Sequence, residues 1–368
     1  MSSVSRRSFV TLSALACTSL ALPRISSAAS GTDRPAGSGK IHLNFNESHL
    51  GPSPLALEKM QAGAASTGRY HYGAQLKLIE LFARQNQIPS DYVHAYSGSR
   101  EPLQYAIAAF TDEQRSLALA TPSYDAPIEA ANSQNVAFHE VPLLPDGAHD
   151  LEAMLKADKK PGLIYICNPN NPTGTVTPQQ QIEKAILAKP EGSVVLIDEA
   201  YIHFSDAASL VPLAAKRKDV LVLRTFSKLY GMAGARLGLA VGHPELLEKI
   251  EVWGGNNFVP LPAAMGGIAS LEDPDLVRQR KQLNTRVREE TRAFLASHGF
   301  TCTPSQANCF MIETGHQAED VIKGLAQRNI LIGRKWDIWP TWVRVSIGTE
   351  AEMLAFRQTF LEVVRQLA

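Results

Sequence analysis

Short apolar runs alternate with stretches of helical periodicity through most of the chain. The apolar runs predict buried strands at 116–120, 163–167, 194–198, 220–225 and 237–241. Between them, the spacing of apolar residues predicts helices near 101–110, 125–134, 178–188 and 208–217. Strands that alternate with helices in this way form a mainly parallel sheet with helices on both faces. The pattern therefore predicts an α/β fold, in which ligands bind at the carboxyl ends of the strands.

The same pattern predicts two domains joined by a long helix. An amphipathic helix over 75–87 opens the first domain, and a helix from 275 to 297, with Gly299 as its stop, leads out of it. The chain then closes with a helix over 350–367. The expected organisation is a linker over 30–40, an N-terminal segment over 41–74, a large domain over 75–274, a connecting helix over 275–299 and a small domain over 300–368.

The first 29 residues have the pattern of an export signal. Arg6 and Arg7 precede a weakly apolar stretch at 11–22, and a run of small residues at 26–30 follows. The apolar stretch is roughly 12 residues long, too short for the ~20 that a membrane-spanning helix needs. Paired arginines followed by Phe9 are typical of the twin-arginine route, which carries folded proteins, so we expect the protein to be periplasmic. A plain basic tail is the alternative.

Composition gives no sign of a nucleic-acid partner or of a membrane-surface partner. The chain has 368 residues, of which 45% are hydrophobic and 20% charged, and its formal net charge is zero. Removal of residues 1–29 would take away three arginines and no acid, which leaves 33 basic against 36 acidic residues. The four cysteines are too few for a disulfide framework, so we expect buried thiols, and we expect no bound metal.

Two segments with the features of ligand-binding turns lie in the first half of the large domain. SGSRE, at 97–101, is a Gly/Ser turn that opens a helix, and the free N–H groups of such a turn bind phosphate. A plain helix cap by Ser97 or Ser99 is the alternative. CNPNNPTGT, at 167–175, directly follows an apolar strand. Its two Asn-Pro steps predict an extended turn from which Asn171 can offer its amide to a ligand.

Two further segments follow the next two strands. IDEAY, at 197–201, ends a strand with Asp198, a carboxylate that needs a cation or a donor if it is buried. A protonated pyridine nitrogen would serve, although a helix-capping role is the alternative. RTFSKLYGMAGARLG, at 224–238, places Lys228 on a glycine-punctuated loop with hydroxyls and Arg236. A partly desolvated lysine beside another cation is a nucleophile for aldehydes, and hydroxyls with an arginine bind phosphate.

In this order, NPTG, D-x-x-Y and S-K-x-x-G-x-x-G-x-R-x-G resemble the fold-type I aminotransferases, which use pyridoxal 5′-phosphate (PLP). The histidinol-phosphate aminotransferase branch is the most similar, because LNFNES at 43–48, GRYHYG at 68–73 and RVSIGT at 344–349 resemble its other motifs. The resemblance covers the chain from about residue 41 onward. It implies the aspartate-aminotransferase-like fold: a large domain with a mainly parallel seven-stranded sheet between helices, and a smaller α+β domain.

The resemblance also implies a role for each matching residue. Lys228 would form a Schiff base with the cofactor and then move a proton between the substrate Cα and the C4′ carbon of the cofactor. Asp198 would keep the pyridine nitrogen protonated, and Tyr124 would stack on the ring. Asn171 and Tyr201 would hold the phenolic oxygen of the cofactor. Its phosphate would be held by the backbone N–H groups of Ser99 and Arg100 and by Thr225, Ser227 and Arg236. Tyr70 would reach the phosphate of the neighbouring subunit in a homodimer, to which the 41–74 segment would contribute.

For the substrate, the resemblance implies Arg344 as the fork for the α-carboxylate and Asn46 as a further contact. Arg334 would match the arginine that binds the substrate phosphate in that branch. The chain departs from the branch where a substrate side chain would be recognised. His71 and Tyr72 follow Tyr70 where Pro and Asp are usual, and Arg100 stands where an acid is common. The segment before Arg344 is short and carries three tryptophans, which would wall the entrance or pack at the domain edge: Trp336, Trp339 and Trp342.

We therefore predict an exported PLP-dependent aminotransferase that moves an amino group between an amino acid and a 2-oxo acid. Histidine synthesis is cytoplasmic, so we expect a substrate other than histidinol phosphate. Two alternatives remain open. A decarboxylase or β-lyase of the same fold would use the same cofactor residues, and a non-catalytic PLP-binding protein would not need Arg344.

Overall fold

The computed structural model describes residues 39–254 and 257–368. The predicted export signal and residues 30–38 of the predicted linker lie outside the described residues. Within the described ranges, no helix combines the length and the apolar character needed to cross a membrane. The described residues form one compact unit.

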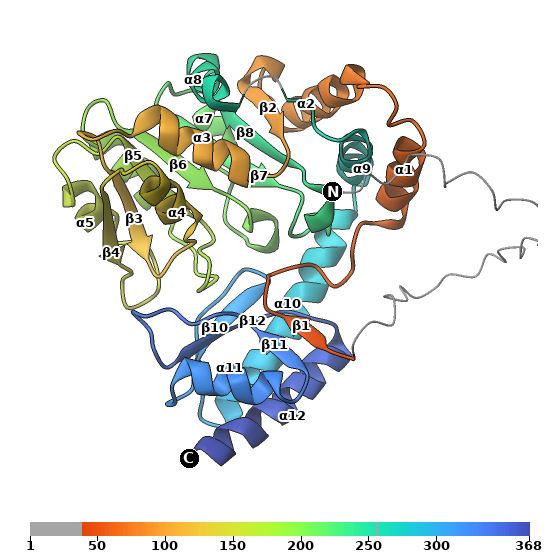
Figure 1. Ribbon diagram of the computed structural model, residues 1–368, viewed down its shortest axis with the longest axis vertical. Helices are drawn as coiled ribbons and strands as arrows, with labels where there is room; N and C mark the ends of the chain where they lie inside the picture. Colours follow the sequence, from red (N-terminus) through yellow and green to blue (C-terminus); the bar gives the residue numbers. More distant parts are fainter. Residues whose placement is uncertain (1–38, 255–256) are drawn as a thin grey trace, which may run out of the picture. The chain divides into compact units, whose positions relative to one another are not determined.

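A seven-stranded sheet is the centre of the large domain (Figure 1). Its strands, in spatial order, are β2 (Val93–Tyr96), β8 (Gly238–Gly242), β7 (Val220–Thr225), β6 (Val194–Asp198), β5 (Leu163–Cys167), β3 (Leu117–Thr121) and β4 (Phe138–Pro142). All neighbouring pairs are parallel except the two that involve β8, which is antiparallel to both β7 and β2. This architecture confirms the predicted fold class, a mainly parallel sheet of the aspartate-aminotransferase type.

Alternation along the central strands creates two separate cores, because successive side chains of a strand point to opposite faces. On one face, side chains such as Ile164 and Ile197 pack against the helices α2 (Tyr72–Asn86), α5 (Leu151–Lys156), α6 (Gln179–Ala188), α7 (Val211–Ala214) and α9 (Leu261–Glu272). On the other face, side chains such as Leu163 and Leu196 pack against α3 (Arg100–Phe110), α4 (Ala126–Ser133) and α8 (Pro244–Gly254). Strands buried on both sides explain the continuous apolar runs in the sequence.

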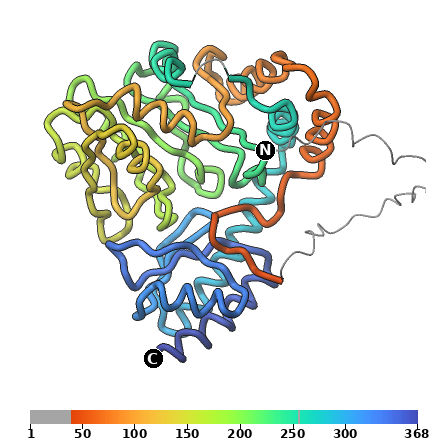
Figure 2. The backbone as a smooth tube through the Cα atoms, in the orientation of Figure 1, coloured from red at the N-terminus to blue at the C-terminus, as the bar shows by residue number. Residues whose placement is uncertain are grey.

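A long helix, α10 (Leu276–Ser297), leads from the large domain into the smaller one. The smaller domain holds the strands β9 (Thr301–Cys302), β10 (Cys309–Glu313) and β12 (Trp342–Ser346), packed with α11 (Ala318–Ala326) and α12 (Glu350–Leu367). The N-terminal strand β1 (Ile41–Leu43) pairs in parallel with β11 (Ile330–Ile332) of this domain. From there the chain runs back to α1 (Pro54–Ala64) beside α9 of the large domain (Figure 2). The N-terminal segment therefore passes along the junction of the two domains.

The structure differs from the sequence predictions at a few elements. The edge strands β2 and β4 were not predicted, because their short runs carry His94, His139 and Glu140 among the apolar residues. The helix predicted over 208–217 is only the four-residue α7. Its start is delayed because the backbone N–H of Leu210 donates to the Glu199 side chain, 2.6 Å away, instead of joining a helix.

Candidate active site

A cavity of about 750 Å³ opens at the carboxyl ends of β5, β6 and β7, between the two domains. The large domain contributes the turns that follow these strands and the start of α3, while the small domain contributes the segment from Ile332 to Trp336 and Arg344. Every site residue predicted from the sequence lines this cavity except Tyr70. Parallel strands bring their carboxyl ends to one edge of a sheet, and this explains the gathering of segments that lie far apart in the sequence.

Asp198 ends β6 and is almost fully buried, with 4% of its surface exposed. Its Oδ2 accepts a hydrogen bond from the Tyr165 hydroxyl at 2.9 Å, and its Oδ1 accepts the backbone N–H of Ala200 at 3.0 Å. Burial raises the pKa of this carboxyl, while the two hydrogen bonds and the charge of Lys228 act in the opposite direction. No cation of the described residues forms an ion pair with Asp198, so its charge remains available to a ligand in the cavity.

Asn171 and Tyr201 lie beside Asp198 and are connected through Asn46. The Asn46 amide donates to the Tyr201 hydroxyl at 3.1 Å and to Asn171 Oδ1 at 3.4 Å. Asn171 Oδ1 also accepts from Arg344 at 2.8 Å. With its oxygen used in this way, Asn171 has its amide N–H groups left for a ligand, and Tyr201 likewise keeps its hydroxyl proton. Both can therefore donate to an oxygen in the cavity.

Lys228 follows β7 and projects into the cavity, where Nζ donates to the Phe45 carbonyl at 3.1 Å. Its ammonium lies 5.7 Å from the centre of the Tyr201 ring. Burial, followed by repulsion from Arg344, lowers the pKa of Lys228 to about 8. About a tenth of this lysine is therefore a neutral amine at pH 7, far more than for an ordinary lysine, and the neutral amine is the form that attacks an aldehyde.

The start of α3 and Arg236 form an anion site at one end of the cavity. Ser99 occupies the N-cap position of α3, but its hydroxyl makes no capping bond, so it stays available to a ligand. Gly98, with φ of +95°, and Gly238 leave no room for a side chain, because a Cβ would lie 2.1 Å from the Arg236 guanidinium or 2.4 Å from the Ser99 nitrogen. Arg236 donates only to carbonyl oxygens, those of Ala233 and Ser97, among its described contacts. These groups together suit a phosphate dianion.

The remaining predicted phosphate ligands differ in their surroundings. Thr225 and Ser227 are buried at the end of β7, and the Ser227 N–H donates to Thr225 Oγ1 at 3.1 Å. The predicted phosphate contact of Arg100 is its backbone N–H at the start of α3, and its side chain forms an ion pair with Glu129. Tyr124 lines the cavity wall, and burial raises the pKa of its hydroxyl to about 12, so it stays protonated.

Arg344 projects from β12 and is buried against the cavity floor. One of its terminal nitrogens donates to Asn171 Oδ1 and the other to the Asn44 carbonyl. Both partners are neutral, and the described residues place no carboxylate within ion-pair distance of Arg344. The positive charge is therefore free to attract a carboxylate from solution.

Arg334 stands at the rim of the cavity, and its charge is already paired. It donates to Asp125 Oδ2 at 2.7 Å, which joins the small domain to the start of α4. Its guanidinium carbon lies 4.4 Å from the centre of the Trp336 ring. The Arg344 guanidinium is 5.3 Å from the same ring, so Trp336 lies close to both arginines.

The other residues where the chain departs from the histidinol-phosphate branch lie away from this cavity. Trp339 and Trp342 pack against each other with ring centres 5.0 Å apart, and the described part of the cavity wall contains neither. His71 stands at the N-terminus of α2 with φ of +49° and contacts the Ser66 carbonyl. Tyr70 is 82% exposed and lies 5.5 Å from the ring of Phe258, in a separate surface hollow.

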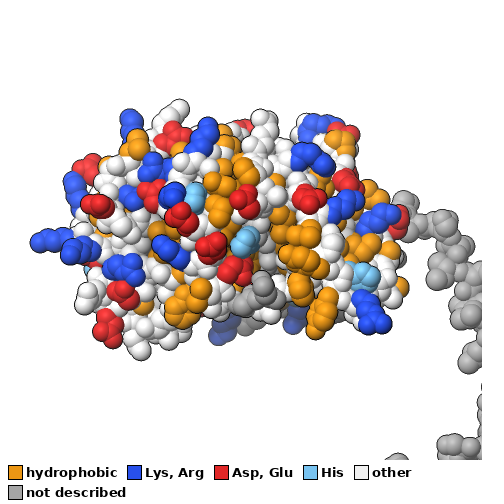
Figure 3. Space-filling view, turned by 90° about the horizontal axis from the view of Figure 1, so that it is seen from above, with side chains coloured by type: hydrophobic (Ala, Val, Ile, Leu, Met, Phe, Trp, Pro, Cys, Tyr) orange, Lys and Arg blue, Asp and Glu red, His pale blue; other side chains and the backbone are white. Residues whose placement is uncertain are grey.

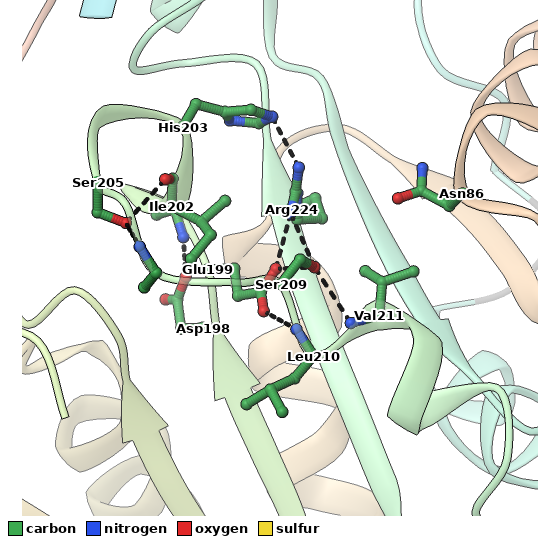
Figure 4. A network of polar contacts seen from close by, with 12 residues as sticks. Asn86, Asp198, Glu199, Ile202, His203, Ser205, Ser209, Leu210, Val211 and Arg224 are labelled. Atoms are coloured by element: carbon green, nitrogen blue, oxygen red, sulfur yellow. Dashed lines mark hydrogen bonds and ion pairs between the residues drawn. The ribbon is translucent and has the colours of Figure 1, made fainter. Parts of the chain in front are cut away.

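A second polar network supports the strand ends from the opposite face of the sheet (Figure 4). Glu199, the residue after Asp198, accepts from Arg224 and from Ser209, each at 2.7 Å. Arg224 also contacts His203 Nε2 at 2.7 Å. Burial and the charge of Arg224 hold the pKa of His203 well below its usual range, so the ring is neutral and accepts this hydrogen bond. The network ties the end of β6 to the end of β7.

Sequence reasoning singled out none of Tyr165, Asp125, Glu199 and Arg224. The last two had a usable signal, since two neighbouring strands end in opposite charges, and buried charges need partners. Tyr165 had none, because a tyrosine inside an apolar strand is typical of ordinary core packing. Asp125 pairs with a residue 209 positions away, which no local pattern indicates.

Comparison with known proteins decides the family. The model of the family "Aminotransferase class I and II" matches residues 38–360. The chain belongs to this family. It is 30% identical over 335 residues to the histidinol-phosphate aminotransferase of Shouchella clausii, a match that covers 89% of this chain and 90% of that protein.

Solved structures agree with this assignment. The histidinol-phosphate aminotransferase of Sinorhizobium meliloti, solved in complex with pyridoxal-5′-phosphate, has a TM-score of 0.82 and 25% identity, with 89% of this chain and 92% of that chain covered. Aspartate aminotransferase of Thermus thermophilus shares the fold, with a TM-score of 0.77 and 18% identity over 88% of this chain and 91% of that chain. The protein is thus a PLP-dependent aminotransferase that resembles histidinol-phosphate aminotransferases.

The residues around the cavity fit PLP. The unpaired carboxylate of Asp198 suits a protonated pyridine nitrogen, and Lys228 is an amine suited to the aldehyde. The cradle of Gly98, Ser99 and Arg236 suits the phosphate, since any side chain at Gly98 would fill it. The neutral partners of Arg344 leave it for a substrate carboxylate.

Proposed function

We propose that this enzyme moves an amino group between an amino acid and a 2-oxo acid in two half-reactions, with the cofactor attached covalently to Lys228. The observation that carries the proposal is the pKa of Lys228, lowered to about 8 inside a cavity that also holds an unpaired carboxylate and an anion site. When bound, PLP supplies an electron sink for the bonds of the substrate Cα.

The residues of the chain then have separate tasks. With PLP bound, Lys228 would take the proton from the substrate Cα and return it at the C4′ carbon of the cofactor. Arg344 holds the α-carboxylate, and Asp198 keeps the ring nitrogen protonated. Asn171 and Tyr201 donate to the phenolic oxygen, while Ser99, Arg100, Thr225, Ser227 and Arg236 hold the phosphate. Ser99 and Arg100 act through their backbone N–H groups at the start of α3, while the Arg100 side chain pairs with Glu129.

The rim of the cavity bears on the choice of substrate. Because Asp125 occupies the guanidinium of Arg334, an anionic group on a substrate side chain must compete with a carboxylate of the chain itself. We therefore propose a free amino acid, or an amino acid unit of a larger metabolite, with an uncharged side chain. Asn46 faces this space through its contacts with Tyr201 and Asn171.

The test is titration of the purified holoenzyme with amino acid donors while the absorption of the bound cofactor is followed. We expect conversion to the amine form of the cofactor with at least one donor, and recovery of the starting spectrum on addition of a 2-oxo acid. Release of carbon dioxide or pyruvate without an acceptor would instead indicate decarboxylation or elimination. Borohydride reduction followed by peptide mass spectrometry should place the cofactor on Lys228, and attachment elsewhere contradicts the proposal.

We also propose that the enzyme is a homodimer in which Tyr70 reaches the phosphate of the neighbouring subunit. Tyr70, Tyr72 and Phe258 form an exposed aromatic group, and apolar side chains are also visible on the face shown in Figure 3. Mixing of two weak variants tests this arrangement. A Lys228→Ala chain and a Tyr70→Ala chain should together regain activity after subunit exchange, because one site of the hybrid then has both residues. No recovery from a mixture that forms hybrid dimers contradicts it.

We further propose export to the periplasm by the twin-arginine route. The support is the sequence alone, with Arg6 and Arg7 ahead of an apolar stretch and a run of small residues. Cell fractionation should find the mature chain in the periplasm, and Arg6→Lys with Arg7→Lys should retain it in the cytoplasm. If the wild-type chain and the double variant distribute equally between cytoplasm and periplasm, the proposal is contradicted.

A further inference from the structure

Beneath Asp198 lies a tyrosine that the reaction, as described so far, does not use. Tyr165 belongs to β5, two residues before the strand reaches the cavity, and its side chain is fully buried. Its hydroxyl donates to Asp198 Oδ2 at 2.9 Å. The neighbouring strands β5 and β6 run in parallel, with Cys167 opposite Asp198, so Tyr165 approaches the carboxylate from the core side.

We propose that Tyr165 is a positioning residue, which orients the Asp198 carboxylate and weakens its basicity so that the shared proton stays on the ring nitrogen of the cofactor. The inference rests on the proposed role of Asp198. It adds a requirement that this role does not state, namely a neutral donor on the far side of the carboxylate.

The electrostatic surroundings show why such a donor matters. Burial favours the protonated form of Asp198, and two hydrogen bonds and the more distant charge of Lys228 oppose this tendency. One hydrogen bond comes from the Ala200 backbone and is fixed by the turn, so among the described residues Tyr165 supplies the side-chain hydrogen bond to this carboxylate. The charged or titratable groups that act on Asp198 from the packed elements are Tyr165, Lys228, Glu199, Tyr124 and Cys167.

Tyr165 can act only as a donor in this position. Burial, followed by the charge of Asp198, raises the pKa of its phenol well above the usual value, so the proton stays on the oxygen throughout the working range. The ring packs in the core between the sheet and the helices α3, α4 and α8. A phenylalanine would fill nearly the same volume there. Core packing therefore requires the ring of Tyr165 but not its hydroxyl.

The test compares two matched substitutions, Tyr165→Phe and Tyr96→Phe. Tyr96 lies in the same core and is also buried, and its hydroxyl donates at 2.7 Å to a carboxylate, Glu251 Oε1, which, unlike Asp198, does not line the cavity. Holoenzyme prepared with PLP labelled with nitrogen-15 in the ring reports protonation directly by its NMR resonance. We expect Tyr165→Phe to shift this resonance toward the unprotonated position, and Tyr96→Phe to leave it unchanged.

Kinetics give a second readout. Loss of a hydrogen bond to a charged group should lower kcat by about tenfold to a hundredfold in Tyr165→Phe, with little change in KM. Tyr96→Phe should keep its kcat within about twofold, although it loses a buried hydrogen bond of its own. If Tyr165→Phe shows the wild-type resonance and loses only stability, the hydroxyl is structural and the inference is wrong.

A third variant keeps the test decisive if Tyr165→Phe does not fold. Site-specific replacement of Tyr165 by 3-fluorotyrosine retains the hydroxyl and strengthens it as a donor, so the resonance should stay at the protonated position. A shift toward the unprotonated position with this analogue overturns the inference. A wild-type holoenzyme whose ring nitrogen is itself unprotonated would instead overturn the proposed role of Asp198, so the two failures are distinguishable.

Discussion

Asp198 and Glu199 are adjacent in the sequence and buried to a similar extent, yet they have opposite surroundings. Glu199 accepts hydrogen bonds from Arg224, Ser209 and the Leu210 backbone, so its charge is fully paired (Figure 4). Asp198 has two donors, Tyr165 and the Ala200 backbone, and no cation of the described residues pairs with it. Successive side chains of a strand point to opposite faces, so at the end of β6 Glu199 lies on the face packed by α2 and α9 and Asp198 on the cavity side.

This difference distinguishes a carboxylate that stabilises the fold from one that can bind a ligand. A buried ion pair that is complete within the chain holds the ends of β6 and β7 at a fixed distance, but it has nothing left for a ligand. A buried carboxylate without a cation costs stability, and the cost is recovered when a cation binds. The chain thus contains one carboxylate of each kind, side by side, and the unpaired one lines the cavity.

The largest effect should come from removal of the unpaired charge. We expect Asp198→Asn to lower kcat/KM by about 10³-fold, because the ring nitrogen loses a buried ionic partner. The melting temperature of the apoenzyme should not fall, since no internal ion pair is lost. Steady-state kinetics and thermal melts of the same preparation provide the check. Activity within tenfold of wild type would show that Asp198 is a structural carboxylate like its neighbour.

Removal of the paired charge should affect stability first. Glu199→Gln leaves Arg224 buried without its counter-ion, and we expect the free energy of unfolding to fall by about 3 kcal/mol. Urea denaturation of the apoenzyme measures this. The folded fraction should keep the nitrogen-15 resonance of the bound cofactor seen in wild type. A changed resonance without a loss of stability would erase the contrast between the two carboxylates.

The pH dependence of cofactor capture sharpens the same contrast. With its pKa lowered to about 8, Lys228 should make capture of PLP by the apoenzyme about tenfold faster per pH unit below 8, with a plateau above. Because the fold favours the neutral amine of Lys228, the free energy of unfolding of the apoenzyme should rise between pH 8 and the ordinary lysine pKa of about 10.4.

Two variants separate the carboxylates in the same measurement. The charge of Asp198 raises the pKa of Lys228, so in Asp198→Asn the capture rate should reach its plateau at lower pH, while in Glu199→Gln it should not. Stopped-flow absorption measures the rates, and a slope that persists to pH 10 contradicts this account.

The smallest effect should come from a third carboxylate, Asp125, whose partner Arg334 is half exposed. Exposed ion pairs are weak, so Asp125→Asn should raise kcat/KM for donors with an anionic side chain by only about two- to fivefold. Donors with an uncharged side chain serve as the internal control and should change little. If both classes change equally, the pair does not select substrates.

Much of the architecture could be predicted because its signals are local. The strands β5, β6 and β7 begin and end at the residues that the apolar runs indicated, and the resemblance of the lysine segment pointed to the family. The predicted seven-stranded sheet is present, although β8 runs antiparallel to its neighbours. Orientation of a strand depends on the length and path of its connection. The connection over 226–237 contains the short turn Ala233–Ala235 and no crossover α-helix, so the chain returns antiparallel, and no periodicity within β8 itself indicates this.

The sequence by itself determined which segments form the central strands β3, β5, β6, β7 and β8, which residues end β5, β6 and β7, and in what order the motifs that resemble those of aminotransferases occur. Only the tertiary structure decided that Tyr165 meets Asp198, that Arg224 meets Glu199 rather than its neighbour, and that Asp125 meets Arg334. The physical reason is that periodicity specifies the face on which a side chain lies, whereas its partner depends on strand order and on the packing of the two domains. These partners distinguish a carboxylate that supports the fold from one that is left for the cofactor.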